Sequence, residues 1–526
     1  MIVTIYETSS IINCGNKTPP RCRTHYFTNR PPLCPRFEGV STFQFCSMPA
    51  VEDIRRAVSS LCLNTGDRRR IFGSTLSALN QHQSATQKSA IPPLWQRREL
   101  NPRLLLRSAT FRTVLTNATI LLLGMGSSVQ LSRWLGPTGR GQIAAAMLWP
   151  MLLTYIMSMG LISAIMYYAA QPETPIQELM ANAAGCAVVQ GTLGIVAGYF
   201  IMPWVLHSQS TVVVHISRWY LSVIPVSLLT QYGCSVLQGK LHFAAFNTSR
   251  LVIPVGYVLG VLLLKMHGTL TFSRAVMLHL FLNVAALALT LIIILTLHLP
   301  IGLRTDWTLA RRMLRYGAQV QAGDLSSAAN LRLDQVLMSA WMPPAMLGLY
   351  VVAVSASGLS DVIALAWRIV ATPAIARQGA IAERRLTLQK TFRRYLLISS
   401  PLTCLLALAL PVLIPAFFGR AFRDSIVPAE VLLVGAVFLS AKNVLGGGLQ
   451  ALGSPWLGSR ADILALIVTV VALPPLLLRY HILGAAIAST LAYATQLCIV
   501  LYGLHHVHSI SPRSLLVSET VKVRNS

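Results

Sequence analysis

The chain has 526 residues, of which 54% are hydrophobic and only 11% are charged. Soluble domains carry about a quarter charged residues, so this composition excludes an ordinary water-soluble protein and indicates one that lies largely in lipid. The formal net charge of +26 would suggest nucleic-acid binding in a soluble protein. Here, however, Lys and Arg concentrate in alternate connections between predicted membrane spans, and we expect no nucleic-acid partner.

Residues 1–107 differ from the rest of the chain. They hold 15 Lys or Arg and 6 Asp or Glu, and no long apolar run. Such a segment is typical of a disordered extension, which is our expectation here. An organelle transit peptide and a true start at Met48 remain alternatives. The five cysteines of this part form no C-x-x-C pair, and we expect all nine cysteines of the chain to be unpaired thiols that hold no metal.

Apolar stretches follow along the remainder of the chain. About 20 apolar residues cross the ~30 Å hydrocarbon core of a bilayer as a helix. We predict twelve such spans, at residues 109–133, 142–169, 179–204, 214–237, 243–265, 275–298, 317–341, 347–374, 393–417, 428–450, 458–478 and 482–504. The expected fold is an all-α integral membrane protein with six spans in 108–300, six in 301–504 and a basic tail in 505–526.

Lys and Arg gather in alternate connections between the spans. The richest connections contain Arg304, Arg311, Arg312 and Arg315, and then Arg377, Arg384, Arg385, Lys390, Arg393 and Arg394. The intervening connections are poorer, and we place Arg140 in one of them, outside. Positive residues favour the cytoplasmic side, so this pattern predicts that both termini lie in the cytoplasm.

The seventh span is unusually polar. On a helix at about 100° per residue, its apolar side chains fall within a narrow stripe. That stripe, the one part of this helix that we expect to face lipid, holds Ala322, Leu325, Ala329, Leu333 and Val336. The other positions include Asp324, Asn330, Arg332, Asp334 and Gln335. A bare charge at bilayer depth costs about 2.5–3.5 kcal/mol, so we expect the polar surface to face other helices or water.

The eighth span repeats this pattern. Ser357, Asp361, Ala364 and Arg368 share one helical face, and Arg368 is expected at the depth of Asp324, where the two can form an ion pair. These intramembrane charges either serve a translocation pathway or only neutralise each other and fix helix packing.

Arg250 and Lys442 lie in other spans. Their side chains either face the same interior or extend to the cytoplasmic surface. Two histidines, His242 and His279, stand alone in their spans.

No catalytic motif stands in the membrane part of the chain. It lacks H-E-x-x-H, G-x-S-x-G and a Walker-type glycine loop, and its loops are short. We expect neither an enzyme nor a cofactor. The run of His505, His506 and His508 after the last span is either a metal ligand set or, as we expect, a solvated flank.

A short repeat follows the first and the seventh span. The segment GRGQIAAA at 139–146 matches AMLGLYVVA at 345–353, with Gly141 aligned to Gly348 and Ala146 to Ala353. A duplication of six spans predicts a repeat at these places.

Several segments carry a family resemblance. These are SRWLGPTGRGQIAAAMLWPMLLTYIMSMGLISAIMYYAA (132–170), LRLDQVLMSAW with LGLYVVAVSASGLSDVI, FGRAFRDSIVPAEVLLVGAV, GGGLQALGSP and GAAIASTLAYATQ. In this order they resemble the oligosaccharide flippases of the multidrug/oligosaccharidyl-lipid/polysaccharide exporter superfamily. The resemblance implies two six-helix lobes around a central cavity in the cytoplasmic membrane, working by alternating access.

The implied substrate is an oligosaccharide linked to a polyprenyl pyrophosphate, embedded among membrane lipids. Cationic side chains can hold its phosphate oxygens, and the candidates are Arg332, Arg368, Arg250 and Lys442. Arg332 and Asp334 match the arginine and aspartate of the family's seventh span. If transport is driven by an ion gradient, Asp324, Asp334 and Asp361 are the candidate ion carriers. Glycosyltransferases, a polymerase and a chain-length regulator are implied as partners.

Other functions remain open. A cation-coupled multidrug exporter of the same superfamily favours an acidic and aromatic pocket, whereas the pocket expected here mixes Arg with Asp. A membrane glycan polymerase or ligase needs a large outer loop, and the sequence shows none. A non-catalytic scaffold has no use for buried charges.

Overall fold

The computed structural model describes residues 109–300, 302, 304–360, 375, 381–454 and 456–516, except for the side chains of residues 109–110, 322–324 and 516. The predicted extension 1–107 lies outside the described residues. The described part is helical, with no strand. Its elements are α4 (Ala109–Met157), α5 (Leu161–Ala170), α6 (Ile176–Val205), α7 (Thr211–Tyr220), α8 (Val223–Gly239), α9 (Phe243–Met266), α10 (Phe272–Thr296), α11 (Trp307–Trp341), α12 (Pro344–Ser357), α14 (Ile381–Phe417), η1 (Arg420–Ser425), α15 (Ile426–Ala451), α16 (Trp456–His508) and α17 (Pro512–Leu516).

These helices confirm a multi-pass membrane protein. Within the described ranges, eight helical stretches are long and apolar enough to cross a membrane. Two of them contain a residue in the left-handed region between two predicted spans: Gly136 (φ 68°) in α4 and His481 (φ 50°) in α16. Glycine adopts this conformation at little cost, which explains the sharp break after the first span. The second predicted span, 142–169, is interrupted after Met157 and continues in α5.

Two helices extend beyond the predicted spans. The seventh and ninth spans are predicted from residues 317 and 393, whereas α11 covers Trp307–Trp341 and α14 covers Ile381–Phe417. The added turns contain Arg311, Arg312 and Arg315 in α11 and Arg384 with Lys390 in α14. A hydropathy window excludes such charges, whereas a helix can continue into water beyond the bilayer.

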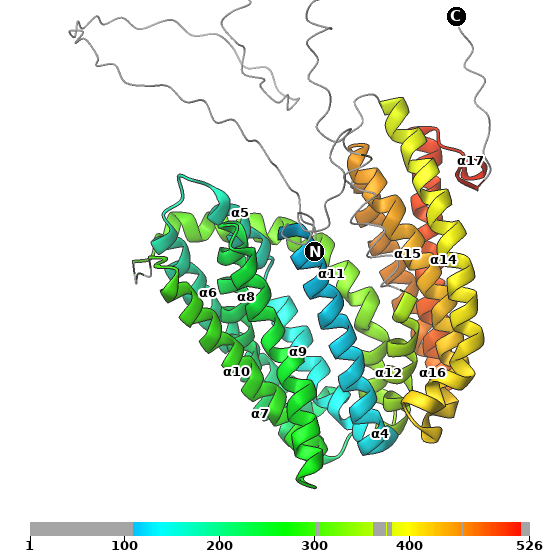
Figure 1. The fold of residues 1–526 in the computed structure, drawn as a ribbon, viewed down its shortest axis with the longest axis horizontal. Coiled ribbons are helices and arrows are strands. Elements are labelled where there is room, and N and C mark those ends of the chain that lie inside the picture. Colours follow the sequence, from blue (N-terminus) through cyan, green and yellow to red (C-terminus); the bar gives the residue numbers. More distant parts are fainter. Residues whose placement is uncertain are drawn as a thin grey trace, which may run out of the picture. The chain divides into compact units, whose positions relative to one another are not determined.

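The helices form two groups that share a core. Figure 1 shows α4 and α6 to α10 side by side, from blue to green, and α14 to α16 together, from yellow to red; the contacts within each group agree. The first group packs α4 against α9 and α8 against α5 and α6. The second group packs α15 against α16 and α14, and it includes α11, which packs against α16, and α12, which packs against α15. The hydrophobic core runs from Leu131 through Tyr350 to Ala486.

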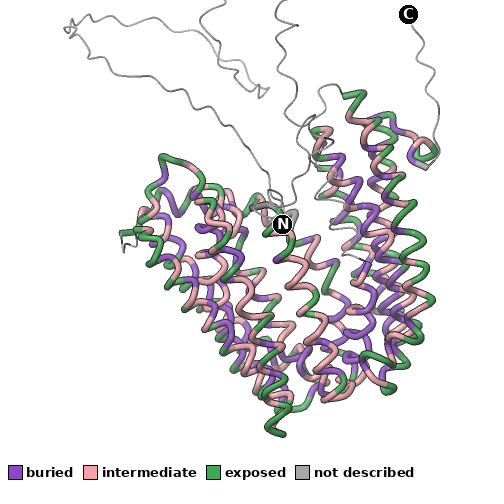
Figure 2. The backbone as a smooth tube through the Cα atoms, in the orientation of Figure 1, coloured by how far each residue is buried: buried purple, intermediate pink, exposed green. Residues whose placement is uncertain are grey.

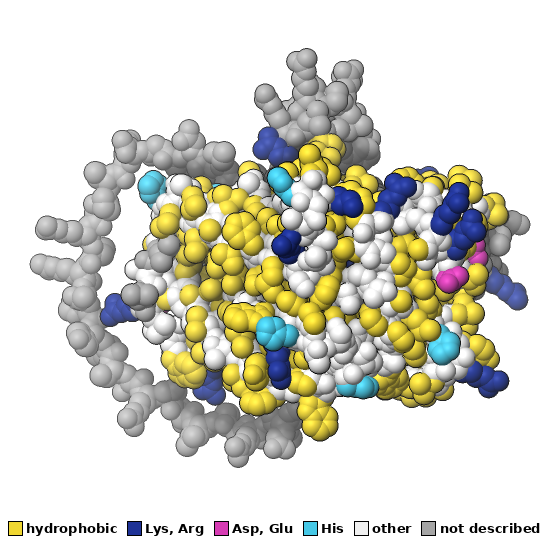
Figure 3. Space-filling view, turned by 90° about the horizontal axis from the view of Figure 1, so that it is seen from below, with side chains coloured by type: hydrophobic (Ala, Val, Ile, Leu, Met, Phe, Trp, Pro, Cys, Tyr) yellow, Lys and Arg dark blue, Asp and Glu magenta, His cyan; other side chains and the backbone are white. Residues whose placement is uncertain are grey.

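Large apolar side chains are exposed along the outer helices. On α6, Val189 is 60% exposed, Phe200 69% and Trp204 83%, and Val412 of α14 is 70% exposed. Figure 2 shows exposed positions recurring over the whole length of these helices, and Figure 3 shows hydrophobic side chains spread across one face. Patches of this extent need a nonaqueous neighbour, and in a protein with membrane spans lipid supplies it.

The two glycines aligned by the sequence repeat pack directly against each other. A Cβ atom on Gly141 would lie 3.0 Å from the amide nitrogen of Gly348, and a Cβ atom on Gly348 would lie 3.0 Å from the amide nitrogen of Gly141. Each would also overlap the carbonyl oxygen of a proline four residues before the other glycine, Pro344 or Pro137. This reciprocity is what a twofold relation between two halves produces, and it supports the predicted duplication.

We predict that Gly141→Ala destabilises the protein. The added methyl group overlaps backbone atoms of α12, and overpacking of this kind costs about 1–3 kcal/mol. Gly124→Ala in the same helix is the control, because nothing lies within 4 Å of its Cβ position and replacement of a helical glycine there stabilises by about 0.5–1 kcal/mol. Thermal unfolding in detergent measures both. Equal unfolding temperatures for the two variants would contradict the tight crossing.

Candidate functional site

The carboxylate of Asp334 lies in the interior of the second helix group. Asp334 is 3% exposed. Its Oδ2 accepts hydrogen bonds from the hydroxyls of Tyr350 (2.5 Å) and Ser489 (2.9 Å), and its Oδ1 accepts one from the amide of Gln335 (2.7 Å). These donors join α11, α12 and α16, and among the described residues no cation lies within 4 Å of this carboxylate. Among the described residues, its hydrogen bonds therefore all come from uncharged donors.

A small cavity adjoins Asp334. Its volume is about 80 Å³, and its polar lining comes from Asp334, Ser357 and Tyr493. A buried water occupies about 30 Å³ of liquid volume, so this space is large enough for water or a small cation.

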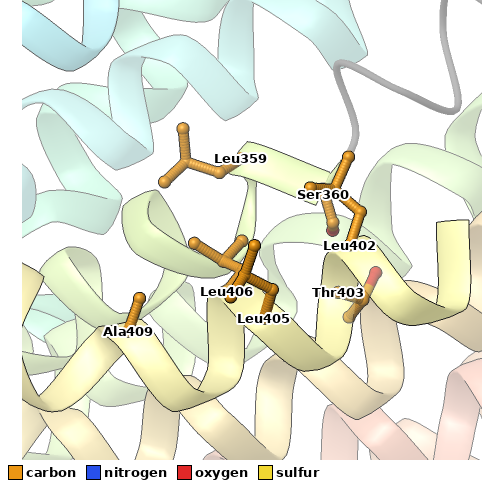
Figure 4. A pocket seen from close by; sticks show the side chains of 7 residues that line it. All are labelled: Leu359, Ser360, Leu402, Thr403, Leu405, Leu406 and Ala409. Atoms are coloured by element: carbon orange, nitrogen blue, oxygen red, sulfur yellow. The ribbon is translucent and has the colours of Figure 1, made fainter.

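A larger cavity of about 330 Å³ lies between the end of α12 and α14. Figure 4 shows that its lining is apolar except for Ser360 and Thr403. It contains none of the predicted site residues and adjoins the stretch 361–374, which lies outside the described residues.

Lys442 is paired inside the second helix group. Its Nζ lies 2.6 Å from Oδ1 of Asp462, and the two residues are 7% and 8% exposed. Asn330 of α11 donates to the carbonyl oxygen of Asp462 (2.7 Å) and accepts from the hydroxyl of Thr469 (3.2 Å). The alternative that Lys442 extends to the surface is therefore wrong. Asp462 escaped the sequence analysis, although a lone carboxylate in an apolar span was a signal for it.

Arg332 and Arg250 have few partners. Arg332 is exposed, and its Nη1 makes one long hydrogen bond, 3.5 Å, to Oε1 of Gln335. Arg332 interacts electrostatically with Asp334 and with Arg140. Arg250 lies over the ring of Phe246 at 5.0 Å, and its buried Nη1 has no hydrogen-bond partner.

Arg140 lies in a helix and not in the predicted loop. This residue lies in α4, one turn after the break at Gly136, and its Nη2 donates to the hydroxyl of Ser128 (3.4 Å). The segment GPTGRG reads as a turn because it is rich in glycine and proline. However, proline is favoured in the first turn of a helix, and the chain resumes its helix at Pro137.

Other expectations on the polar spans have mixed outcomes. Asp361, Arg368 and the side chain of Asp324 lie outside the described residues, and so does the predicted ion pair of Asp324 with Arg368.

In the predicted lipid-facing stripe of the seventh span, Leu325 is 36% exposed but Val336 is only 3% exposed. Val336 was misplaced because α11 packs against several helices, α16 among them, and not against one neighbour.

His279 does not stand alone. Its Nδ1 lies 2.7 Å from the hydroxyl of Tyr220 and 3.1 Å from Nδ2 of Asn283. Among the described residues, no group of three or more His, Cys, Asp or Glu side chains is placed to hold a metal ion.

We predict that Lys442→Met alone destabilises the protein by about 3–5 kcal/mol, because it leaves Asp462 as an uncompensated buried charge. The double variant Lys442→Met with Asp462→Leu should recover most of this loss. Unfolding in detergent tests the cycle, with Lys265→Met at the exposed end of α9 as a control. A double variant no more stable than Lys442→Met would contradict the pairing.

Comparison with known sequences gives a family match. The model of a family described as polysaccharide biosynthesis protein matches residues 130–427. The probable low-salt glycan biosynthesis flippase Agl15 of Haloferax volcanii is 30% identical over 114 residues, which is 19% of this chain and 23% of the relative. The match therefore spans about a quarter of the length of that curated relative.

Solved structures show the same fold at low identity. The lipid II flippase MurJ in an inward closed conformation superposes with a TM-score of 0.61 at 13% identity, over 76% of this chain and 88% of MurJ. An inward-facing multidrug resistance MATE family transporter of the MOP superfamily gives a TM-score of 0.61 at 12% identity, over 75% and 98%. These likenesses confirm the all-α transporter fold. Since the family model covers more than half of the chain, the protein belongs to the polysaccharide biosynthesis protein family.

Proposed function

We propose that the protein flips oligosaccharides linked to a polyprenyl pyrophosphate across the cytoplasmic membrane, for the synthesis of a cell-surface polysaccharide. The family membership and the local similarity to a glycan biosynthesis flippase support this proposal. The helical fold, shared with MurJ and with MATE transporters, suits alternating access between two bundles. Glycosyltransferases, a polymerase and a chain-length regulator would be partners in such a pathway.

The observation that carries the proposal is that Arg332 has few hydrogen-bond partners. A guanidinium at this depth costs about 2.5–3.5 kcal/mol unless it meets water, an anion or acceptors. Arg332 has one long hydrogen bond and no carboxylate within 4 Å among the described residues. Its remaining donors suit phosphate oxygens, which a guanidinium can bind through two parallel hydrogen bonds. Lys442 is neutralised by Asp462, and it and Arg250 are weaker candidates for phosphate binding. Arg368 remains a candidate on the basis of the sequence.

Arg332→Ala should reduce translocation of a lipid-linked oligosaccharide about tenfold or more, since one charge-assisted bond contributes about 1.5–3 kcal/mol. The assay is the appearance of the glycan in the opposite leaflet of proteoliposomes under an imposed proton or sodium gradient. Arg368→Ala should act likewise. Arg274→Ala is the control, because Arg274 is exposed and donates to the carbonyl of Thr269 at the start of α10. Full transport by both test variants at normal protein levels would overturn the proposed cationic site.

Coupling to an ion gradient would involve Asp334, whose carboxylate borders the 80 Å³ cavity, or the two other candidates, Asp324 and Asp361. If a carboxylate carries the proton, its Asp→Asn variant should lose the pH dependence of transport, because an amide does not titrate. The measurement is the initial rate of translocation against pH for each variant. Profiles identical to the wild type in all three variants would exclude proton coupling through these residues.

Multidrug export is the second candidate. The buried carboxylate of Asp334, which has no cation within 4 Å among the described residues, favours it, because such a group can attract a cationic drug. Efflux of a cationic dye from the same proteoliposomes, without translocation of any glycan lipid, would select this function over the proposed one.

A further inference from the structure

The connection between α6 and α7 reaches across to the end of α11. Gln209 lies in this connection, and its Nε2 donates to the carbonyl oxygens of Ser339 (3.0 Å) and Met342 (3.1 Å). The hydroxyl of Ser208 lies 3.4 Å and 3.5 Å from the same two oxygens. Gln209, Ser339 and Met342 are all buried. One amide of the first helix group therefore holds the carboxyl-terminal end of a helix in the second group.

The sequence explains why this end of α11 needs a side-chain donor. The last carbonyl groups of a helix have no partner within the helix. The amide of Met342 still bonds to the carbonyl oxygen of Met338, but the next amide would belong to Pro343, which has no N–H. The carbonyl oxygen of Ser339 is thus left without a backbone donor, and an unpaired buried carbonyl is costly. The amide from the α6–α7 connection removes this cost.

A second polar contact reaches the same serine from the first helix group. The indole Nε1 of Trp149 in α4 donates to the hydroxyl of Ser339 (3.0 Å). Gly141 of α4 crosses Gly348 one turn into α12, which follows directly. Contacts between the two groups therefore gather where α11 ends and α12 begins. This end of α11 is the one opposite to its arginine-rich first turns.

The contact made by Gln209 leaves one of its atoms unsatisfied. Two carbonyl oxygens accept from this amide, so its nitrogen faces them, and its Oε1 is buried without a hydrogen-bond partner. A buried acceptor without a donor costs free energy. If the connection moves away from α11, water can reach the Oε1, the amide nitrogen and the two carbonyl oxygens. The cost of the closed arrangement makes this contact one that can be broken and made again.

We propose that Gln209 is the gate of this end of the bundle: it holds the two helix groups together in the structure described, and it releases Ser339 and Met342 when the interior opens on this side. The inference rests on the proposed flippase function, because alternating access requires one end to open while the other is closed. The Lys and Arg pattern predicts that this end faces away from the cytoplasm. Breaking the contact thus belongs to the step that releases the glycan.

Distances between spin labels test the gate apart from transport. The labels are attached at His207→Cys and Trp341→Cys, two exposed positions beside the contact, in protein without native cysteines in nanodiscs. Gln209→Glu keeps the shape of the side chain but replaces its N–H donors with an oxygen, which the two carbonyl oxygens repel. We expect the population with the longer distance to rise about tenfold or more, because two hydrogen bonds are lost. Gln231→Glu is the control, since Gln231 bonds to Ser227 within α8.

A reversible cross-link tests the gate with Gln209 in place. A short bifunctional methanethiosulfonate that joins the cysteines introduced at positions 207 and 341 should reduce glycan-lipid translocation in proteoliposomes about tenfold or more. Cleavage by a reductant should restore it. This arm remains decisive if Gln209→Glu folds poorly.

The gate and the proposed function fail in different ways. Wild-type distances in folded Gln209→Glu, or full translocation by the cross-linked protein, would overturn the gate and leave the flippase function standing. A longer distance in Gln209→Glu but not in Gln231→Glu, in a protein that moves no glycan lipid, would keep the gate and reject the flippase function.

Discussion

A charge inside a lipid bilayer has no bulk water to solvate it. This constraint explains the contacts that the charged side chains of α11 and its neighbours make. Asp334 of α11 satisfies it with two hydroxyls and a backbone amide. Lys442 satisfies it with a carboxylate from the neighbouring helix α16. Among the described residues, Arg332 and Arg140 each make one long hydrogen bond and have no carboxylate within 4 Å. The solvation of these two arginines therefore requires a ligand or water.

The polar contacts also decide which helices belong together. Asp334 connects α11, α12 and α16, and Asn330 ties α11 to the pair formed by Lys442 and Asp462. A buried network of this kind is stable only when its members are satisfied together. The second helix group is therefore held in register by polar bonds, where lipid supplies no hydrophobic force between helices.

Small residues provide the contact between the two helix groups. Gly141 and Gly348 let α4 and α12 touch along their backbones, and Gly160 with Gly317 allows a second close approach, between the break after α4 and α11. Trp149 reaches across to the hydroxyl of Ser339 at the far end of α11 (3.0 Å). Close backbone packing without large side chains is typical of membrane helices, and it allows two groups to meet without interlocking deeply. Such an interface suits bundles that move relative to each other.

The sequence by itself determined the helical class, the multi-pass membrane character and the two charged residues of α11 on which the candidate site is built. Hydropathy and helical periodicity are local properties, so a window of 20 residues reveals a span, and the charges of Arg332 and Asp334 stand out within it. The tertiary structure alone decided that Asp462 neutralises Lys442, that His279 bonds to Tyr220, and that Arg140 bonds to Ser128. These relations join residues from different helices, and their distances depend on how each helix is rotated and packed. No local pattern contains that information, because desolvation and pairing act between segments that are distant along the chain.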